Sequence, residues 1–164
     1  MGAVAELARI REQLERIGAL CGDARLFTVN ERVSARSPAE HVDHLLKVTK
    51  SILDRIPSEE VVPRPFSFVG RCLLALRWIP RGIGRAPERL HGKRTTPEDL
   101  QARLARVTAA LGTIDPAAID AARIRNVPHP RFGGLTPAQA LRFAAVHNEH
   151  HLKIVRDVLG VRWR

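Results

Sequence analysis

The feature that most constrains the fold is a helix-start signal that occurs three times. It appears in the segments Ser37-Pro38-Ala39-Glu40, Thr96-Pro97-Glu98-Asp99 and Thr136-Pro137-Ala138-Gln139. A hydroxyl before the first turn accepts a hydrogen bond from a free backbone N–H, and the acid or amide three residues later can reach back to the cap. Proline is favoured at the first helical position because its missing N–H would have had no partner there. The three signals predict helices that begin at residues 38, 97 and 137.

The ends of these helices are also predicted by local signals. The first should end before Pro57, because proline disfavours a helical residue ahead of it. The other two should end near Gly112 and Gly160. A fourth helix is expected over residues 3–20, where apolar residues recur at three- and four-residue spacing. These are Leu7, Ile10, Leu14 and Ile17. The sequence therefore predicts an all-α four-helix bundle in a single domain over residues 1–164.

Several segments between the main helices carry weaker signals. Phe66 to Ile79 is a weaker helical stretch, and Pro80 to Arg94 is rich in Gly, Pro and Arg. We expect an extra short helical and basic loop region there, between the second and third main helices. Asp115-Pro116 can start one more short helix, and Val127 to Gly134 is expected to be a loop.

The chain is strongly basic, with a net charge of +10 from 27 Lys and Arg against 17 Asp and Glu. A basic balance raises the case for nucleic acid or another anionic partner. No recognised DNA-binding motif accompanies it, so solvated arginine-rich faces are the better interpretation. The same choice, an anion-binding role or a solvated face, applies to the arginines of region 71–94. These are Arg71, Arg77, Arg81, Arg85 and Arg89.

The pattern of hydropathy favours a cytoplasmic protein. The first 20 residues alternate apolar and charged side chains, unlike a secretory signal. No window approaches 18 uncharged apolar residues, so we expect no membrane span. Cys21 and Cys72 lie far apart and form no C-x-x-C pair, and we expect them to stay reduced and to act as small apolar residues.

The residues that indicate chemistry lie on the last helix. One stripe of that helix steps by four and three residues through Ala140, Ala144, His147, His151, Ile154 and Val158. An apolar residue would pack there at a lower cost than imidazole, which has two nitrogens to satisfy. Residues at i and i+4 stack one turn apart, so His147 and His151 can bind one metal ion. His150 falls about 100° from His151 and is expected at the rim.

A third ligand should come from a neighbouring helix, and two candidates lie on the second one. The apolar face there consists of Val42, Leu45, Val48, Thr49, Ile52 and Ile56. His41 lies nearer the centre of this face than His44, so burial alone would favour His41. Periodicity does not decide between them.

Three blocks of residues resemble the DinB/YfiT-like superfamily. Ser37-x-x-Glu40-x-x-x-His44-Leu45 is similar to the family's second-helix signature, and His147-Asn148-Glu149-His150-His151 to its H-x-x-H-H block. The segment from His129 to Thr136 resembles the HP-x-x-G-x-L-T lead-in of many members. The resemblance covers roughly Ser37 to Gly160. One departure is Arg36, where many members carry Trp before the capping serine.

The resemblance implies a metal-binding four-helix bundle with the ligands His44, His147 and His151. Neutral imidazole suits a divalent transition ion such as Zn, Ni or Fe. Three protein ligands leave open positions, as in catalytic sites. The family includes enzymes that use low-molecular-weight thiols and presumed metal-dependent hydrolases. It thus implies hydrolysis or S-transfer on a small-molecule substrate, and a homodimer.

Residues near the expected ligands have alternative roles. His129 has two possible roles. It is a catalytic acid or base, or a hydrogen-bond donor to a metal ligand, if its loop folds over the site, or else it is a loop histidine bonded to backbone. Glu40 is expected to act in the capping box, and Asp43 and Glu149 to point to solvent. Two other functions stay open. One is a non-catalytic binding protein whose basic surface holds nucleic acid or an acidic partner, and the other is a helical domain without metal.

Overall fold

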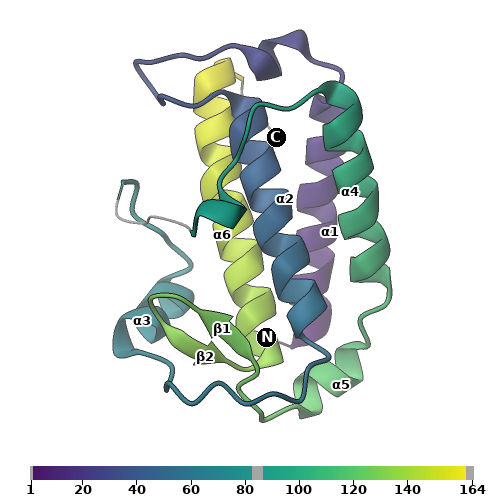
Figure 1. Ribbon diagram of the computed structural model, residues 1–164, viewed down its shortest axis with the longest axis vertical. Helices are drawn as coiled ribbons and strands as arrows, with labels where there is room; N and C mark the ends of the chain where they lie inside the picture. The colour runs from purple at the N-terminus through teal and green to yellow at the C-terminus, as the bar shows by residue number, and fades with distance from the viewer. Residues whose placement is uncertain (1, 83–86, 162–164) are drawn as a thin grey trace.

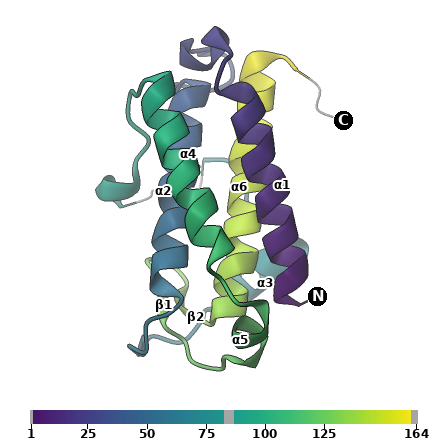
Figure 2. The same cartoon turned by 90° about the vertical axis from the view of Figure 1, so that its right-hand side faces the viewer.

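Four long helices form the body of the molecule in a computed structural model, which describes residues 2–82 and 87–161. They are α1 (Ala3–Leu20), α2 (Pro38–Arg55), α4 (Pro97–Gly112) and α6 (Pro137–Leu159). The two views in Figures 1 and 2 show them side by side along the long axis. All four were predicted with these starting residues, and their ends agree within about two residues.

The predicted caps explain where three of these helices begin. The Ser37 side chain accepts from the Glu40 backbone N–H, and the Glu40 carboxylate accepts in return from the Ser37 N–H at 2.9 Å. Thr136 and Gln139 form the same reciprocal pair at the start of α6. Thr96 accepts from the Asp99 N–H at the start of α4. The expected capping role of Glu40 is confirmed.

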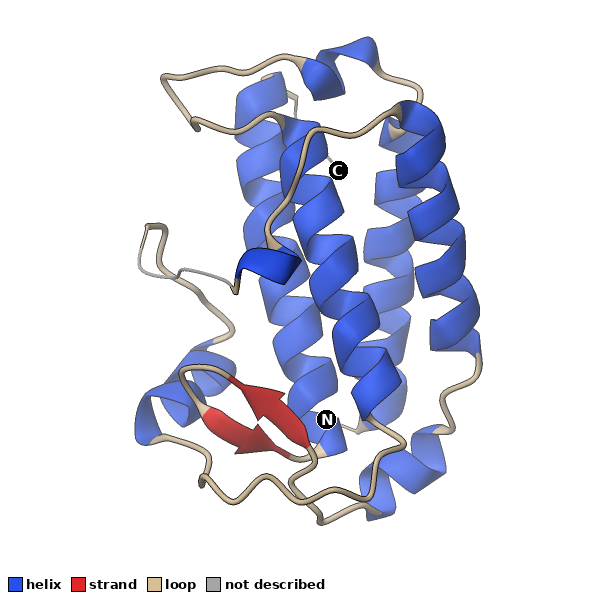
Figure 3. Cartoon of the chain, in the orientation of Figure 1, coloured by secondary structure: helices blue, strands red, loops and turns tan. Residues whose placement is uncertain are grey.

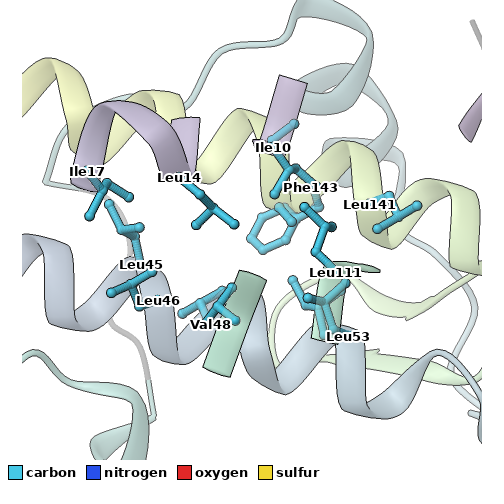
Figure 4. Packing of buried hydrophobic residues seen from close by; sticks show 14 of the residues in the cluster. Ile10, Leu14, Ile17, Leu45, Leu46, Val48, Leu53, Leu111, Leu141 and Phe143 are labelled. Carbon is cyan, nitrogen blue, oxygen red and sulfur yellow. The ribbon is translucent and has the colours of Figure 1, made fainter. Parts of the chain in front are cut away.

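The helices bury a core of aliphatic side chains between them. Helix α2 packs against α4 and α6, and α1 packs against the same two helices. Figure 4 shows residues of this core, including Ile10, Leu14, Ile17, Leu45, Leu46 and Leu141. Each fully buried aliphatic side chain stabilises the fold by about 1.5–3 kcal/mol. Within the described part of the chain, no helix is both long enough and apolar enough to cross a membrane.

Short elements connect the long helices. The 3-10 helix η1 (Ala24–Phe27) follows α1, and α5 (Pro116–Ala121) follows α4 with Asp115 as its cap. Between α2 and α4 lie α3 (Phe68–Leu76) and the 3-10 helix η2 (Glu88–Leu90). The extra helical region was therefore predicted correctly. In the adjoining loop, Leu90 packs against the core.

The segment predicted as a loop over residues 127–134 instead forms most of a β-hairpin. Strands β1 (Val127–His129) and β2 (Gly133–Leu135) pair antiparallel, with Val127 opposite Leu135. Gly133 has a φ of +86°, and a Cβ there would overlap the Pro65 carbonyl, so this turn requires glycine. The fold is mostly helical, which is consistent with the predicted all-α class, and the hairpin is its one strand pair among the described residues. Figure 3 shows the hairpin beside the long helices, and Figure 1 places α3 next to it.

Candidate metal centre

Helices α2 and α6 bring three histidines together. His44 comes from α2, and His147 and His151 come from successive turns of α6. One ring nitrogen from each lies within 4.8 Å of the other two. The ring centroids are 5.0 Å apart for His44 and His147, 4.7 Å for His44 and His151, and 4.5 Å for His147 and His151. The predicted trio thus converges on one point.

A loop carbonyl orients the first of these histidines. His44 Nδ1 lies 2.5 Å from the Leu90 carbonyl oxygen, and because a carbonyl only accepts, Nδ1 carries the proton. The lone pair of His44 is then at Nε2. The loop is held on α2 by two more bonds, from Lys47 Nζ to the His91 carbonyl at 3.0 Å and from the Lys93 N–H to Asp43 at 2.9 Å. Outer bonds of this kind commonly fix the orientation of a metal-binding histidine.

The other candidate on α2, His41, lies behind His151. Its Nδ1 is 3.1 Å from His151 Nδ1, and its Nε2 is 2.9 Å from Ser34 Oγ. Burial does not separate the two candidates, since His41 is 8% exposed and His44 is 6% exposed. The direction of the two rings distinguishes them. Of His41 and His44, only His44 has a nitrogen in the group that lies within 4.8 Å. The group is the one that the family resemblance implied.

Burial keeps these imidazoles neutral. Desolvation is the largest cause that lowers the pKa of His44, and it holds the pKa of His147 and of His151 well below the ordinary histidine value. His147 Nδ1 is buried and has no hydrogen-bond partner among the described residues. Neutral imidazole is the form that binds metal, so three buried, uncharged nitrogen donors fit a divalent transition ion.

A large cavity adjoins the three histidines. Its volume is about 1080 Å³, and the triad forms part of its wall. The apolar part of the wall includes Val48, Ile52, Leu73, Leu135, Phe143 and Ile154. Three exposed arginines, Arg36, Arg89 and Arg131, also line it. Arg36 is close enough to His41 and His44 to lower their pKa values. His150 lines the cavity too, as expected of a rim residue.

His129 lies on β1 and faces the same cavity from the hairpin. Its Nδ1 accepts from the N–H groups of Arg131 and Phe132, both at 3.2 Å, which leaves a proton on Nε2. Burial lowers the pKa of His129 to about 4, so the ring is neutral near pH 7. Its centroid is 4.7 Å from that of Phe143, which in turn lies 5.5 Å from that of His147. His129 thus combines a backbone-bonded nitrogen with a place on the cavity wall, one aromatic ring away from the triad.

The expectation that Asp43 points to solvent was wrong. Its side chain is 2% exposed and pairs with Lys47 at 2.6 Å and with Arg103 of α4 at 2.8 Å. One step along a helix turns a side chain by about 100°, so Asp43 faces α4 while His44 faces α6. Glu149 is 40% exposed and lies 3.8 Å from Arg16, so it is partly solvated as expected.

Two arginines of region 71–94 pair with carboxylates, and the Arg81 side chain is still 50% exposed, as expected of a solvated face. Arg77 donates to both oxygens of the buried Glu6 at 2.8 Å, and Arg142 of α6 donates to the same carboxylate at 3.3 Å. Arg81 pairs with Asp157 at 2.5 Å. Arg71 is exposed, Arg89 lines the cavity, and Arg85 lies outside the described residues.

Sequence reasoning missed three groups that shape the site. The Leu90 carbonyl and Ser34 come from loops whose path is set by tertiary contacts, and no local signal marks them. Phe143 lies one turn before His147 on α6, at the i−4 position of the histidine stripe. That spacing would have placed Phe143 on the cavity wall.

The chain matches a known protein family over most of its length. A family model described as the DinB superfamily matches residues 5–155. This range includes His44, His129, His147 and His151. No curated protein and no solved structure shows a significant match to the chain.

Proposed function

We propose that this chain, which belongs to the DinB superfamily, is a divalent-metal-dependent enzyme on a DinB-like four-helix bundle. His44, His147 and His151 would hold the ion. One observation carries the proposal: three buried imidazoles from α2 and α6 bring nitrogens within 4.8 Å of one another at the wall of a cavity. Buried polar atoms usually have a partner, and His147 Nδ1 has none among the described residues, so a ligand at this site is expected.

The ligand set favours catalysis over a structural role. Three protein ligands leave coordination positions for other molecules, whereas structural ions usually have four. A divalent ion such as Zn, Ni or Fe supplies Lewis acidity, which lowers the pKa of a water or thiol that it binds. The reaction would be hydrolysis or S-transfer with a low-molecular-weight thiol.

The cavity wall indicates the shape of the substrate. Aliphatic and aromatic residues line much of it, so we propose a small molecule with an apolar body. Arg36, Arg89 and Arg131 add positive charge to the wall. Among the described residues that line it, the one carboxylate is Glu60, which already pairs with Arg55. An anionic group on the substrate would be favoured near the three arginines.

His129 would act on the substrate rather than on the ion. Its pKa of about 4 makes it a neutral donor through Nε2–H near pH 7, and Phe143 stands between it and the triad. We propose that His129 donates a hydrogen bond to a polar group of a molecule in the cavity. A hydrogen-bond donor placed where negative charge develops stabilises a transition state.

A binding protein is the second candidate, and the net charge of +10 favours it. In that case the basic surface would hold nucleic acid or an acidic partner. Retention on heparin or DNA would then fall steeply with salt and would survive the loss of the histidines. A homodimer in the cytoplasm remains our prediction for either function.

The first experiment measures metal content by mass spectrometry on protein purified without chelator. We expect about one ion per chain in the wild type and none in a His147→Leu, His151→Leu double variant. His150→Gln is the matched control, since it changes a histidine of the same helix outside the trio. A wild type that stays free of metal after incubation with Zn, Ni and Fe would overturn the proposal. If the wild type does bind metal, the loaded protein is next assayed for ester hydrolysis and for thiol transfer to an aromatic electrophile.

A further inference from the structure

We propose that His41 is a positioning residue that sets which nitrogen of His151 is available to a metal ion. The inference rests on the metal site proposed above and assigns a role to a histidine outside the trio. His41 lies on α2 one turn before His44 and is 8% exposed. Its contacts form a chain that starts at His151 and ends in the loop before α2.

This hydrogen-bonded series has three side chains, those of His151, His41 and Ser34, joined by two hydrogen bonds. His151 Nδ1 and His41 Nδ1 are 3.1 Å apart, and His41 Nε2 and Ser34 Oγ are 2.9 Å apart. Ser34 Oγ also accepts from the Arg36 N–H at 3.0 Å. That backbone bond holds the hydroxyl in place just before the capping box of α2. The hydrogen-bonded series therefore ends on the Ser34 hydroxyl oxygen, which the Arg36 N–H holds in place.

Each neutral imidazole carries one N–H proton, so the protons of His151, His41 and Ser34 can be placed in two ways. In the first, His151 Nδ1–H donates to His41 Nδ1, and His41 Nε2–H donates to Ser34 Oγ. The lone pair of His151 is then at Nε2, free for an ion. In the second, the Ser34 hydroxyl donates to His41 Nε2 and His41 Nδ1–H donates to His151 Nδ1. His151 then carries its proton at Nε2 and cannot bind metal through it.

Two histidines of the trio, His44 on α2 and His151 on α6, differ in the kind of hydrogen-bond partner that their Nδ1 has. His44 donates to the Leu90 carbonyl, which can only accept, so its tautomer has one solution. His151 faces another imidazole, which can donate or accept, so its tautomer depends on His41. An ion on His151 Nε2 would select the first arrangement, in which His41 Nδ1 accepts a hydrogen bond from His151 Nδ1–H. Metal-binding histidines commonly need such an outer acceptor.

The rival role for His41 is that of a fourth ligand, which would close the site. Both of its nitrogens are engaged, one by His151 and one by Ser34. Its nitrogens are also outside the group that lies within 4.8 Å. We therefore assign His41 to the support of His151 and not to the ion.

The test compares zinc dissociation constants, measured by competition with a chromophoric chelator, in four proteins. They are the wild type, His41→Leu, His41→Gln and Ser34→Ala. Loss of an outer-shell partner weakens metal binding by roughly 10–100-fold, and we expect this for His41→Leu. His41→Gln keeps an acceptor oxygen for His151 and should recover most of the affinity. Ser34→Ala should fall between the wild type and His41→Leu.

Two spectroscopic measurements separate support from ligation. The visible spectrum of Co(II)-loaded protein should keep its band pattern in His41→Leu, because the number of ligands is unchanged. A changed coordination number would overturn the inference in favour of a fourth ligand. Nitrogen NMR of the zinc-loaded wild type should show the His151 proton on Nδ1, and a proton on Nε2 would also overturn it.

The outcomes distinguish this inference from the proposed function. A wild type that binds zinc while His41→Leu binds it equally well contradicts the role of His41 alone. A wild type that binds neither zinc nor cobalt contradicts both. Circular dichroism of each variant checks the fold, and the NMR measurement on the wild type stands even if His41→Leu does not fold.

Discussion

Two buried polar clusters in this molecule are alike in burial and opposite in chemical state. Glu6 is 3% exposed, yet its carboxylate is charged, because hydrogen bonds from Arg77 above all and from Arg142 outweigh burial and lower its pKa. His147 is 9% exposed and neutral, and its Nδ1 has no partner within the described chain. The carboxylate cluster is complete without any further group. The histidine cluster is incomplete, which is expected of a site that awaits a ligand.

The same contrast occurs between neighbours on α2. Asp43 forms ion pairs with Lys47 and Arg103, and it also holds the Lys93 N–H. The next residue, His44, uses one nitrogen for the Leu90 carbonyl and turns the other to the cavity side. Charged groups that pair with one another join the elements of the fold, whereas neutral imidazoles form the candidate centre.

The largest effect is expected from the histidines, and it should be on metal binding and not on the metal-free fold. His147→Leu should abolish binding of about one ion per chain, measured by mass spectrometry. The free energy of unfolding of the metal-free protein should change little or rise, because an unpartnered buried nitrogen is removed. A loss of stability comparable with that of a charge-pair variant would contradict the contrast.

The next largest effect should follow from Glu6→Gln. The substitution leaves Arg77 without its bidentate partner in a partly buried place, and we expect a loss of roughly 2–3 kcal/mol at pH 7. Urea unfolding followed by circular dichroism measures it. Metal content should stay at the wild-type level, and a large decrease in it would show that the two clusters are not separate.

Acid should reduce the difference in unfolding free energy between the wild type and Glu6→Gln. The folded pKa of Glu6 lies below its ordinary value of 4.5, so its contribution is fully present above that value. It is lost as the pH falls through the lower folded pKa. The gap in unfolding free energy between the wild type and Glu6→Gln should be constant from pH 7 to about 5 and shrink below. A gap that stays constant into strong acid would assign the effect to packing.

A smaller effect is expected where the loop before α4 crosses α2. A Cβ on Gly92 would overlap the Glu40 carbonyl, so Gly92→Ala should displace the loop and cost about 1–3 kcal/mol. Because Leu90 belongs to the same loop, zinc affinity should fall as well. Gly22→Ala is the matched control, since nothing lies within 4 Å of a Cβ there. Equal affinities in both variants would show that the loop does not support His44.

The smallest effect should be at an exposed pair. Glu12 and Arg16 lie 2.5 Å apart on α1 with side chains 59% and 33% exposed. Glu12→Gln should change the unfolding free energy by less than about 0.5 kcal/mol, as measured by urea unfolding. A loss as large as that of Glu6→Gln would mean that burial does not explain the difference between the two carboxylates.

Local signals predicted the long helices because capping is a local interaction. Ser37, Thr96 and Thr136 each bond a residue three positions away, so a few letters of sequence determine where each helix starts. The hairpin could not be predicted in this way. Its strands have three residues each, and it is held by contacts such as the Gly134 N–H on the Arg64 carbonyl.

The site was predictable in part for a similar reason. The spacing of His147 and His151 is a property of one helix, and the family motif added His44. The burial of Asp43 depends on Arg103, which comes from a different helix, and helical periodicity has no access to that pairing. The contact of His41 with His151 depends on how α2 and α6 rotate against each other, which also lies outside any single segment.

The placement of the trio on α2 and α6 links occupancy to unfolding. The three nitrogens come together only while both helices are packed, so an ion held by them would bind the native state and have little affinity for the separated segments. Such a ligand stabilises by RT ln(1 + [L]/Kd), or about 4 kcal/mol at a thousand times its dissociation constant. The melting temperature would then rise with the concentration of free ion. Melting temperatures measured at free-ion concentrations set by a chelator would therefore give the affinity for the ion, before any substrate is known.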